Sequence, residues 1–253
     1  MKILLKISYV GTAYCGYQVQ PNGISIQQRL NEAAKSVFGF DCDIVGCSRT
    51  DSGVHANEFC ATVTKKGSKD LPTAIPAEKI PLAMCAYLPQ DIAVFFAKWV
   101  QNDFHARYDV REKEYLYRFY NRAARSPFEE NRAAHIPKPL SDEDIERMNR
   151  AAQYLCGRHD FAAYMAQGSS VKDTVRTVTR ASVTRDGGDV VIFRVAADGF
   201  LYNMVRILAG TLLLVGQGKL APEDVIRITQ SKCRAEAGST MPACGLYLNR
   251  VVY

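Results

Sequence analysis

The sequence predicts an α+β fold made of two halves that repeat one order of elements, β-α-β-β-α-β. Three observations support this. Several short segments alternate apolar and polar residues, which is the spacing of a half-buried strand. Between them lie capped segments with apolar residues at helical spacing. The length of 253 residues gives room for one large domain or two smaller ones. We expect the halves at 1–103 and 104–253.

The first half begins with a strand, because KILLKISY (residues 2–9) places every second residue on one face. A helix follows, in which Ser25 is expected to cap the start, Gln28 to reach back to the cap, and Gly39 to end the helix. The buried stripe of this helix is Ile26, Leu30, Ala33 and Val37. The half is completed by strands at about 42–47 and 58–65, a short helix after Pro81, and a strand at about 92–100.

The second half begins with a strand in REKEYLYRFYN, where Tyr115, Tyr117 and Phe119 share a face. A helix starts at the Ser141 cap with Asp144 at the capping-box position, and it buries Ile145, Met148, Ala152 and Leu155. Two strands, near 174–185 and 189–196, meet at the turn DGGD. The half ends with a helix at about 200–216 (stripe Leu201, Val205, Leu208, Leu212 and Val215), a short helix near Pro222, and a strand in GLYLNRVVY.

Both halves therefore have the split β-α-β arrangement of ferredoxin-like domains. Joined through their sheets into a central, mainly antiparallel sheet, they would leave a cleft between them. The segment GCSRTDSGVHANEF (46–59) lies in the first half, on the loop between its two middle strands. The helix carrying Arg206 has the corresponding place in the second half. We therefore expect both to contribute to one site.

The charge of the chain suggests a polyanionic partner. Lys and Arg number 32 against 26 Asp and Glu, which gives a net charge of +6. Mildly basic proteins often bind nucleic acid. No apolar run approaches the ~18 residues of a membrane span. The segment MKILLKISYV is interrupted by Lys6 and Ser8, unlike a secretory signal. We expect a cytoplasmic protein with no membrane partner.

Metal and nucleotide cofactors are not expected. The eight cysteines include no CxxC pair and the four histidines include no HExxH, so we interpret the cysteines as free thiols used as small apolar side chains. GQGK at 216–219 fails as a phosphate loop because Leu220 stands where Ser or Thr is needed. The absence of GxGxxG and GxSxG motifs argues against nucleotide-cofactor enzymes and hydrolases.

The candidate functional residues also have ordinary structural explanations. Asp51 fits a turn aspartate that bonds its own backbone, Arg49 a solvated arginine, and His55 a partly buried histidine held by a main-chain carbonyl. Tyr115 and its neighbours on the strand fit core packing. Arg206 is harder to explain, because YNMVRILAG surrounds it with apolar residues and a buried arginine needs a carboxylate partner.

Six segments together resemble the tRNA pseudouridine synthase I (TruA) family: YVGTAYCGYQVQ, RTDSGVHA, DFHARY, HDF, NMVR and GLYL. They occur in the family's order from residue 9 to residue 248, and the RTD-x-GVHA element is highly specific. The sequence departs from the family's pattern at three positions. Ser48 replaces a Gly, Ser52 replaces an Ala, and Tyr17 stands where the family often has Trp or Phe.

The resemblance implies the pseudouridine synthase fold and an isomerase that acts on the anticodon stem-loop of tRNA, at positions 38–40. The N-glycosidic bond of a uridine is cut, the base is turned, and it is rejoined to the sugar through carbon. This chemistry requires no cofactor and no metal. The resemblance also implies a homodimer, with one tRNA reaching across both subunits.

The same resemblance assigns roles to five residues. Asp51, ionised at its reference pKa of ~3.9, is the catalytic nucleophile or base. Tyr115 stacks on the target base, Arg206 pairs with Asp51, and Arg49 holds the extruded nucleotide. Leu246 lines the pocket.

Two other functions are compatible with the residues. One is a nucleic-acid enzyme of the glycosylase or nuclease type, which would use Asp51 with a second carboxylate. The other is a non-catalytic RNA-binding module with Tyr115, Tyr117 and Phe119 as a stacking platform. A pure binding module has no reason to carry the Asp51 loop.

Overall fold

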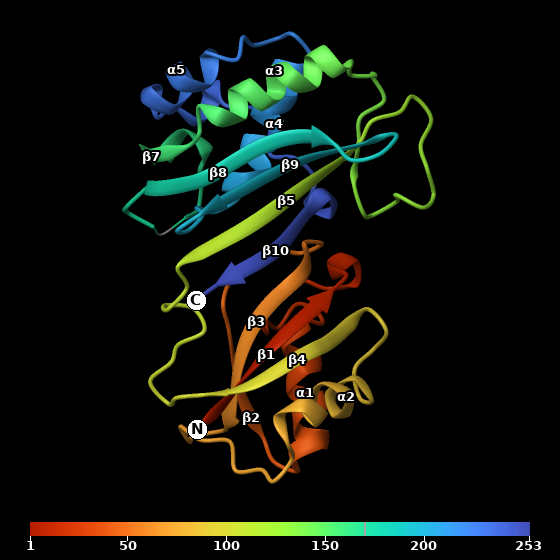
Figure 1. Cartoon of the computed structure of the whole chain (residues 1–253), viewed down its shortest axis with the longest axis vertical. Coiled ribbons are helices and arrows are strands. Elements are labelled where there is room, and N and C mark those ends of the chain that lie inside the picture. Colours follow the sequence, from red (N-terminus) through yellow and green to blue (C-terminus); the bar gives the residue numbers. More distant parts are fainter. Residues whose placement is uncertain (170) are drawn as a thin grey trace. The chain divides into compact units, whose positions relative to one another are not determined.

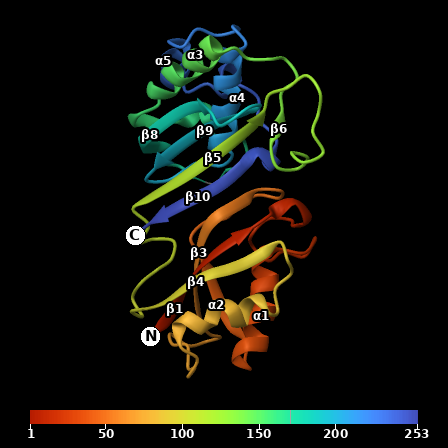
Figure 2. The same ribbon diagram turned by 45° about the vertical axis from the view of Figure 1, so that its right-hand side comes forward.

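The computed structural model of the chain describes residues 1–169 and 171–253, and it contains two compact units (Figures 1 and 2). The first unit is Met1–Arg111 together with Tyr247–Tyr253, and the second is Glu112–Leu246. These units differ from the ranges 1–103 and 104–253. The C-terminal residues 247–253 belong to the first unit because residues 247 and 248 pair with one of its strands.

The first unit has the ferredoxin-like order of strands. Its elements are β1 (Lys2–Tyr9), η1 (Gly11–Ala13), α1 (Ile26–Phe38), β2 (Cys42–Gly46), β3 (His55–Lys65), η2 (Ala77–Lys79), α2 (Ile80–Cys85), β4 (Ile92–Val100) and β10 (Leu246–Val252). The antiparallel order is β4-β1-β3-β2. Helices α1 and α2 lie together beside this sheet (Figure 1). The predicted β-α-β-β-α-β order is confirmed for this unit.

Strand β3 has two partners on one edge. Its residues 61–65 pair with antiparallel β2, whereas His55 and Ala56 pair with parallel β10 at Tyr247 and Leu248. The loop 47–54 between β2 and β3 therefore lies next to the place where β10 joins the sheet.

Helix α1 follows the sequence pattern with one change. Ser25 caps it by accepting the N–H of Gln28 at 3.2 Å, and Gly39 ends it with φ 79°. The Gln28 side chain donates to Glu32 at 3.0 Å, so the predicted reach back to the cap is wrong. Glu32 lies one turn further along the same helix face, and its carboxylate accepts a charge-assisted hydrogen bond from the Gln28 amide, which turns that side chain away from the cap. The predicted stripe is buried except at Val37, which is half-buried.

The second unit contains β5 (Glu112–Tyr120), β6 (Ala134–His135), α3 (Asp142–Gln153), β7 (Gly157–Asp160), η3 (Ala162–Tyr164), β8 (Val175–Arg185), β9 (Val190–Ala197), α4 (Met204–Gly216), α5 (Asp224–Ser231), η4 (Arg234–Glu236) and η5 (Ala243–Gly245). The order β5-β9-β8-β7 is antiparallel, and β6 runs parallel to β5. Figure 2 shows α3, α4 and α5 grouped beside these strands.

Local signals in the second unit act as predicted in three places. Ser141 and Asp144 form a complete capping box at the start of α3. Gly187 and Gly188 turn the β8–β9 hairpin with φ 58° and 61°. The predicted α4 stripe is buried. Helix α4 begins at Met204 rather than near 200, because Asn203 before it has the left-handed φ of 59°.

The predicted fold class, α+β with a mainly antiparallel sheet, is confirmed. The short strands β6 and β7 were not predicted, since two to four residues carry too little alternation to recognise. The cleft between the two halves stays a prediction.

Candidate active site

The loop 47–54 carries Arg49 and Asp51, and hydrogen bonds tie it to the segment 9–17. The hydroxyls of Tyr9 and Thr50 are 2.8 Å apart and buried. The main-chain N–H of Tyr17 donates to the carbonyl of Thr50 at 3.1 Å. The Ser52 hydroxyl donates to the carbonyl of Tyr14, also at 3.1 Å. The residues on both sides of Asp51 are therefore anchored to one neighbouring segment.

Two glycines allow this close approach of backbones. A Cβ atom on Gly11 would lie 2.0 Å from the carbonyl oxygen of Val54, and one on Gly16 would lie 2.6 Å from that of Thr50. Gly16 also has φ 96°, which L side chains rarely adopt. Any larger residue at either position would push the Asp51 loop away from its anchor.

A short turn places the Asp51 side chain. The carbonyl of Asp51 accepts the N–H of Val54 at 3.2 Å, and Gly53 takes φ 79° within the turn. The turn predicted from the sequence therefore exists, and a main-chain hydrogen bond closes it. The Asp51 side chain is half-buried, and Arg49 is exposed.

His55 supports the loop from inside. It begins β3, is 1% exposed, and its ring stacks on Tyr247 with centroids 4.6 Å apart. Its Nδ1 accepts the N–H of Gly11 at 3.0 Å. A nitrogen that accepts from an amide carries no proton, so this contact does not present an acid to substrate.

The aromatic residues of β5 divide into a core pair and a separate candidate. Tyr117 and Phe119 are fully buried, and the Tyr117 hydroxyl donates to the carbonyl of Pro242 at 2.7 Å. These two residues belong to the core, so the stacking platform proposed for a binding module is wrong. Tyr115 is buried with its ring edge-on to Phe200, at a centroid distance of 5.0 Å.

Arg206 lies in the first turn of α4 and binds neutral oxygens. Its Nε donates to the carbonyl of Met241 and one terminal nitrogen donates to Oδ1 of Asn203, both at 2.7 Å. The apolar surroundings that made its position hard to explain are thus offset by a main-chain carbonyl and a side-chain amide, two acceptors that sequence spacing does not reveal. Arg206 is half-buried.

The predicted site residues fall on both units. Arg49 and Asp51 share one loop of the first unit, whereas Tyr115, Arg206 and Leu246 belong to the second. Leu246 is a buried residue at the start of β10. Gly245 before it approaches the Tyr117 ring so closely that a Cβ atom would lie 2.7 Å from it.

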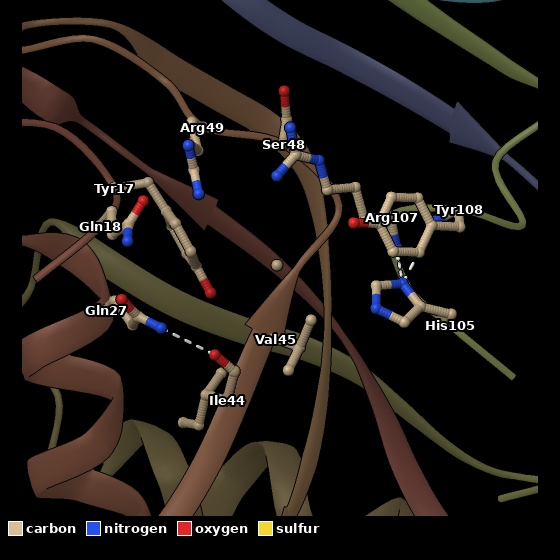
Figure 3. Close-up of a pocket in the computed structure, with 11 residues that line it drawn as sticks. Tyr17, Gln18, Gln27, Ile44, Val45, Ser48, Arg49, His105, Arg107 and Tyr108 are labelled. Atoms are coloured by element: carbon tan, nitrogen blue, oxygen red, sulfur yellow. Dashed lines mark hydrogen bonds between the residues drawn. The ribbon is translucent and has the colours of Figure 1, made fainter. Parts of the chain in front are cut away.

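A pocket of about 230 Å³ opens beside the Asp51 loop in the first unit (Figure 3). It is lined by Tyr17, Gln18, Gln27, Ile44, Val45, Gly46, Ser48, Arg49, His105, Arg107 and Tyr108. Several of these residues lie in the segments YVGTAYCGYQVQ and DFHARY, but sequence reasoning assigned them no role. Only the fold shows that the two segments meet at one pocket.

Metal-binding geometry is absent from the described residues, in which no cluster of three or more His, Cys, Asp or Glu side chains could hold an ion. The eight cysteines are free thiols, as expected. Burial raises the pKa of Cys42 to about 11 and that of Cys60 to about 12, which fits apolar packing. Within residues 1–169 and 171–253, the structure has no helix of the length and apolar character needed to span a membrane.

Comparisons with known proteins identify relatives over the whole chain. A family model described as tRNA pseudouridine synthase matches residues 151–253. The tRNA pseudouridine synthase A of Thermoanaerobacter sp. strain X514 is 43% identical over 251 residues, which cover 99% of both chains. The tRNA pseudouridine synthase A 2 of Clostridium perfringens strain 13 is 42% identical with the same coverage.

Similarity to solved structures is weaker. A crystal structure of a Cbf5-Nop10-Gar1 complex aligns with 97% of this chain and 57% of that chain, at a TM-score of 0.37 and 12% identity.

The family match and the full-length relatives define the class of the protein, which is an isomerase of the pseudouridine synthase type. At 43% identity over nearly its full length, the chain belongs to the tRNA pseudouridine synthase A family. The non-catalytic binding module is therefore excluded.

Proposed function

We propose that the protein converts uridine to pseudouridine in the anticodon stem-loop of tRNA, at positions 38–40, with Asp51 as the catalytic nucleophile or base. The observation that carries the proposal is the fixed position of Asp51. Thr50 and Ser52, on either side of it, are both bonded to the segment 9–17. A half-buried carboxylate on an anchored loop loses little conformational freedom when it meets a substrate.

The reaction is an isomerisation with balanced bonds. The bond between the sugar C1′ and N1 of uracil breaks, and a bond between C1′ and C5 forms. C5 loses its proton and N1 gains one, so the product has the mass of the substrate. Asp51 acts either by attacking the sugar or the base, or by taking up the C5 proton.

The other candidate residues complete the site. Tyr115 stacks on the target base, and Leu246 lines the pocket for that base. Arg49 is exposed on the same loop as Asp51 and suits a phosphate of the extruded nucleotide. Arg206 orients the Asp51 carboxylate, and its bonds to Met241 and Asn203 fix the direction of the guanidinium. No metal or nucleotide cofactor takes part.

We also propose a cytoplasmic homodimer in which one tRNA contacts both subunits. The net charge of +6 supports a polyanionic partner. Light scattering of the purified protein, alone and with tRNA, tests the dimer. A monomer in both samples contradicts it.

The decisive experiment uses a tRNA transcript tritiated at C5 of uridine, because each turnover releases that hydrogen. The wild-type protein releases tritium, and Asp51→Asn binds the transcript within a few-fold of wild type and releases none. A transcript with cytidine at positions 38–40 releases none with either protein. Release by Asp51→Asn above trace contradicts the catalytic role, and release from the cytidine transcript contradicts the position.

A further inference from the structure

The pocket beside Arg49 is built mainly from β2, the segment 9–20 and residues 105–108. Its wall is fixed by Gln27 of α1, whose amide donates to the carbonyl of Ile44 at 2.8 Å and whose oxygen accepts the N–H of Val19. The exposed side chain of Val45 adds an apolar surface. These hydrogen bonds hold the wall of the pocket in place.

Tyr17 contributes a buried hydroxyl to this pocket. The residue is 3% exposed, and its hydroxyl has no hydrogen-bond partner in the part of the chain that the structure describes. Figure 3 shows this hydroxyl directed toward the middle of the pocket. A buried hydroxyl without a partner is unfavourable for folding, so its retention calls for a bond that the protein itself does not supply.

The position of the Tyr17 ring is fixed. It stacks on Phe59, with centroids 4.3 Å apart and planes at 27°. A Cβ atom on Gly46 would lie 2.6 Å from the Tyr17 ring, so only glycine lets the ring lie against β2. Burial, followed by the neighbouring Cys47, raises the pKa of Tyr17, so the hydroxyl stays protonated at neutral pH.

The rim of the pocket is cationic and aromatic. Arg49 and Arg107 are both exposed, and Tyr108 is 75% exposed. The ring of His105 packs 4.2 Å from that of Tyr108, and Nδ1 of His105 accepts the N–H groups of Arg107 and Tyr108. The exposed tyrosine is thus presented by a segment held in a defined turn.

We propose that this pocket binds one unpaired nucleotide of the RNA substrate, other than the uridine that is isomerised. The base accepts a hydrogen bond from the Tyr17 hydroxyl through a ring carbonyl or nitrogen. The Tyr108 ring offers a stacking surface, and Arg107 holds the phosphate of this nucleotide, while Arg49 holds that of the extruded uridine. The inference rests on the proposed function, since it names a second contact of the same RNA.

The size of the pocket favours this ligand. About 230 Å³ is below the ~300–1,000 Å³ that holds a drug-sized molecule, so one planar base fills it while the sugar and phosphate stay outside. Cationic side chains on the rim beside neutral donors, among them the Tyr17 hydroxyl, match a nucleotide, in which one anionic group is attached to one neutral ring.

The first test is Tyr17→Phe, which removes only the hydroxyl. It is made in an Asp51→Asn background, so that the dissociation constant for tRNA is measured without turnover. Loss of one neutral hydrogen bond weakens tRNA binding by about two- to tenfold. The melting temperature of the free protein rises or is unchanged, because the unpartnered group is gone. The matched control is Tyr87→Phe, at an exposed tyrosine outside the pocket, which changes neither quantity.

The second test addresses the phosphate. Arg107→Gln lowers the slope of log affinity against log salt by about one unit. Arg150→Gln, at an exposed arginine of α3, leaves the slope unchanged. Unchanged affinity in Tyr17→Phe, or an unchanged slope in Arg107→Gln, overturns the proposal.

Titration with uridine 5′-monophosphate separates an RNA subsite from a site for free nucleotides. The RNA subsite binds this mononucleotide far more weakly than tRNA. If the mononucleotide binds as tightly as tRNA and depends on Tyr17, the pocket is a free-nucleotide site and the proposal fails. A wild-type protein that releases no tritium would defeat the proposed reaction, while these dissociation constants would still report on the pocket.

Discussion

The hydroxyls of Tyr9 and Thr50 lie 2.8 Å apart in the interior, so the residue directly before Asp51 is tied to the end of β1. Thr50 was not singled out from the sequence, because a threonine between Arg49 and Asp51 carries no chemistry of its own. Its contribution is to fix the main chain from which Asp51 projects.

Thr50→Val tests this anchor, because it keeps the shape of the side chain and removes the hydroxyl. Stranding one partner of a buried hydrogen bond costs about 1–3 kcal/mol, so the free energy of unfolding falls by that order. Turnover falls as the loop loses its fixed position, while tRNA binding changes little. Urea denaturation and tritium release measure the two effects. Thr50→Ser, which keeps the hydroxyl, stays close to wild type, and a Thr50→Val enzyme with full activity would show that the loop needs no such anchor.

Gly16→Ala and Gly39→Ala compare two glycines that share a positive φ. Gly39 has φ 79° with open space around it, so alanine there costs about 1 kcal/mol from backbone strain alone. Gly16 adds a contact of 2.6 Å with the carbonyl of Thr50. We expect Gly16→Ala to be more destabilising and to lower turnover, whereas Gly39→Ala leaves turnover intact. Equal effects on both quantities would mean that the Asp51 loop adjusts freely.

Asp160 gives the stability of the second unit a dependence on pH. The Lys232 ammonium, then the Thr174 hydroxyl and the N–H of Ala162, hold the pKa of the Asp160 carboxyl below its ordinary value. A lowered folded-state pKa means that the stabilisation is present above the ordinary pKa of ~3.9 and is lost as pH falls through the lowered one.

Asp160→Asn therefore lowers the free energy of unfolding at neutral pH. The expected loss is only about 1 kcal/mol, because Lys232 is largely exposed and solvent screens its attraction to the Asp160 carboxylate. The difference from wild type shrinks as the pH falls below about 4. Denaturation at a series of pH values between roughly 3 and 7 measures this difference in the free energy of unfolding, because carboxyl groups titrate over that span. Asp103→Asn, at an exposed aspartate, serves as the control, and a difference that persists unchanged in acid would contradict the assignment.

The ion pair between Asp51 and Arg206 stays a prediction, and a double-mutant cycle tests it. If the two charges meet, Arg206→Met destabilises the protein and abolishes turnover, and adding Asp51→Leu recovers stability without activity. Arg206→Lys retains weak activity at best, because Lys cannot reproduce the two bonds to Met241 and Asn203. Strictly additive effects on thermal unfolding would contradict the ion pair.

Local signals were sufficient for most of the fold. The Ser25 and Ser141 caps, the Gly39 end and the Gly187–Gly188 turn act through contacts within a few residues, so the sequence displays them directly. Contacts between distant segments were not visible in this way. Arg206, for example, donates to the carbonyl of Met241, 35 residues further along the chain.

In the candidate site, too, some residues could be predicted from the sequence and others could not. Asp51 and Arg49 were found from one specific segment. The pocket behind them was missed, because Tyr17 and Arg107 are ordinary residues until the chain brings them together. No periodicity or composition marks a buried hydroxyl that lacks a partner.

Because residues 247–253, which include most of β10, belong to the first unit, that unit can be completed only late in translation. The ribosome makes residues 112–246 before Tyr247, whose ring covers His55 and whose backbone pairs with β3. Until then the start of β3 lacks its parallel neighbour, and His55 lacks one of its packing surfaces. A nascent chain thus completes the support of its Asp51 loop only after the second unit has been synthesised, and a fragment released before that point lacks it.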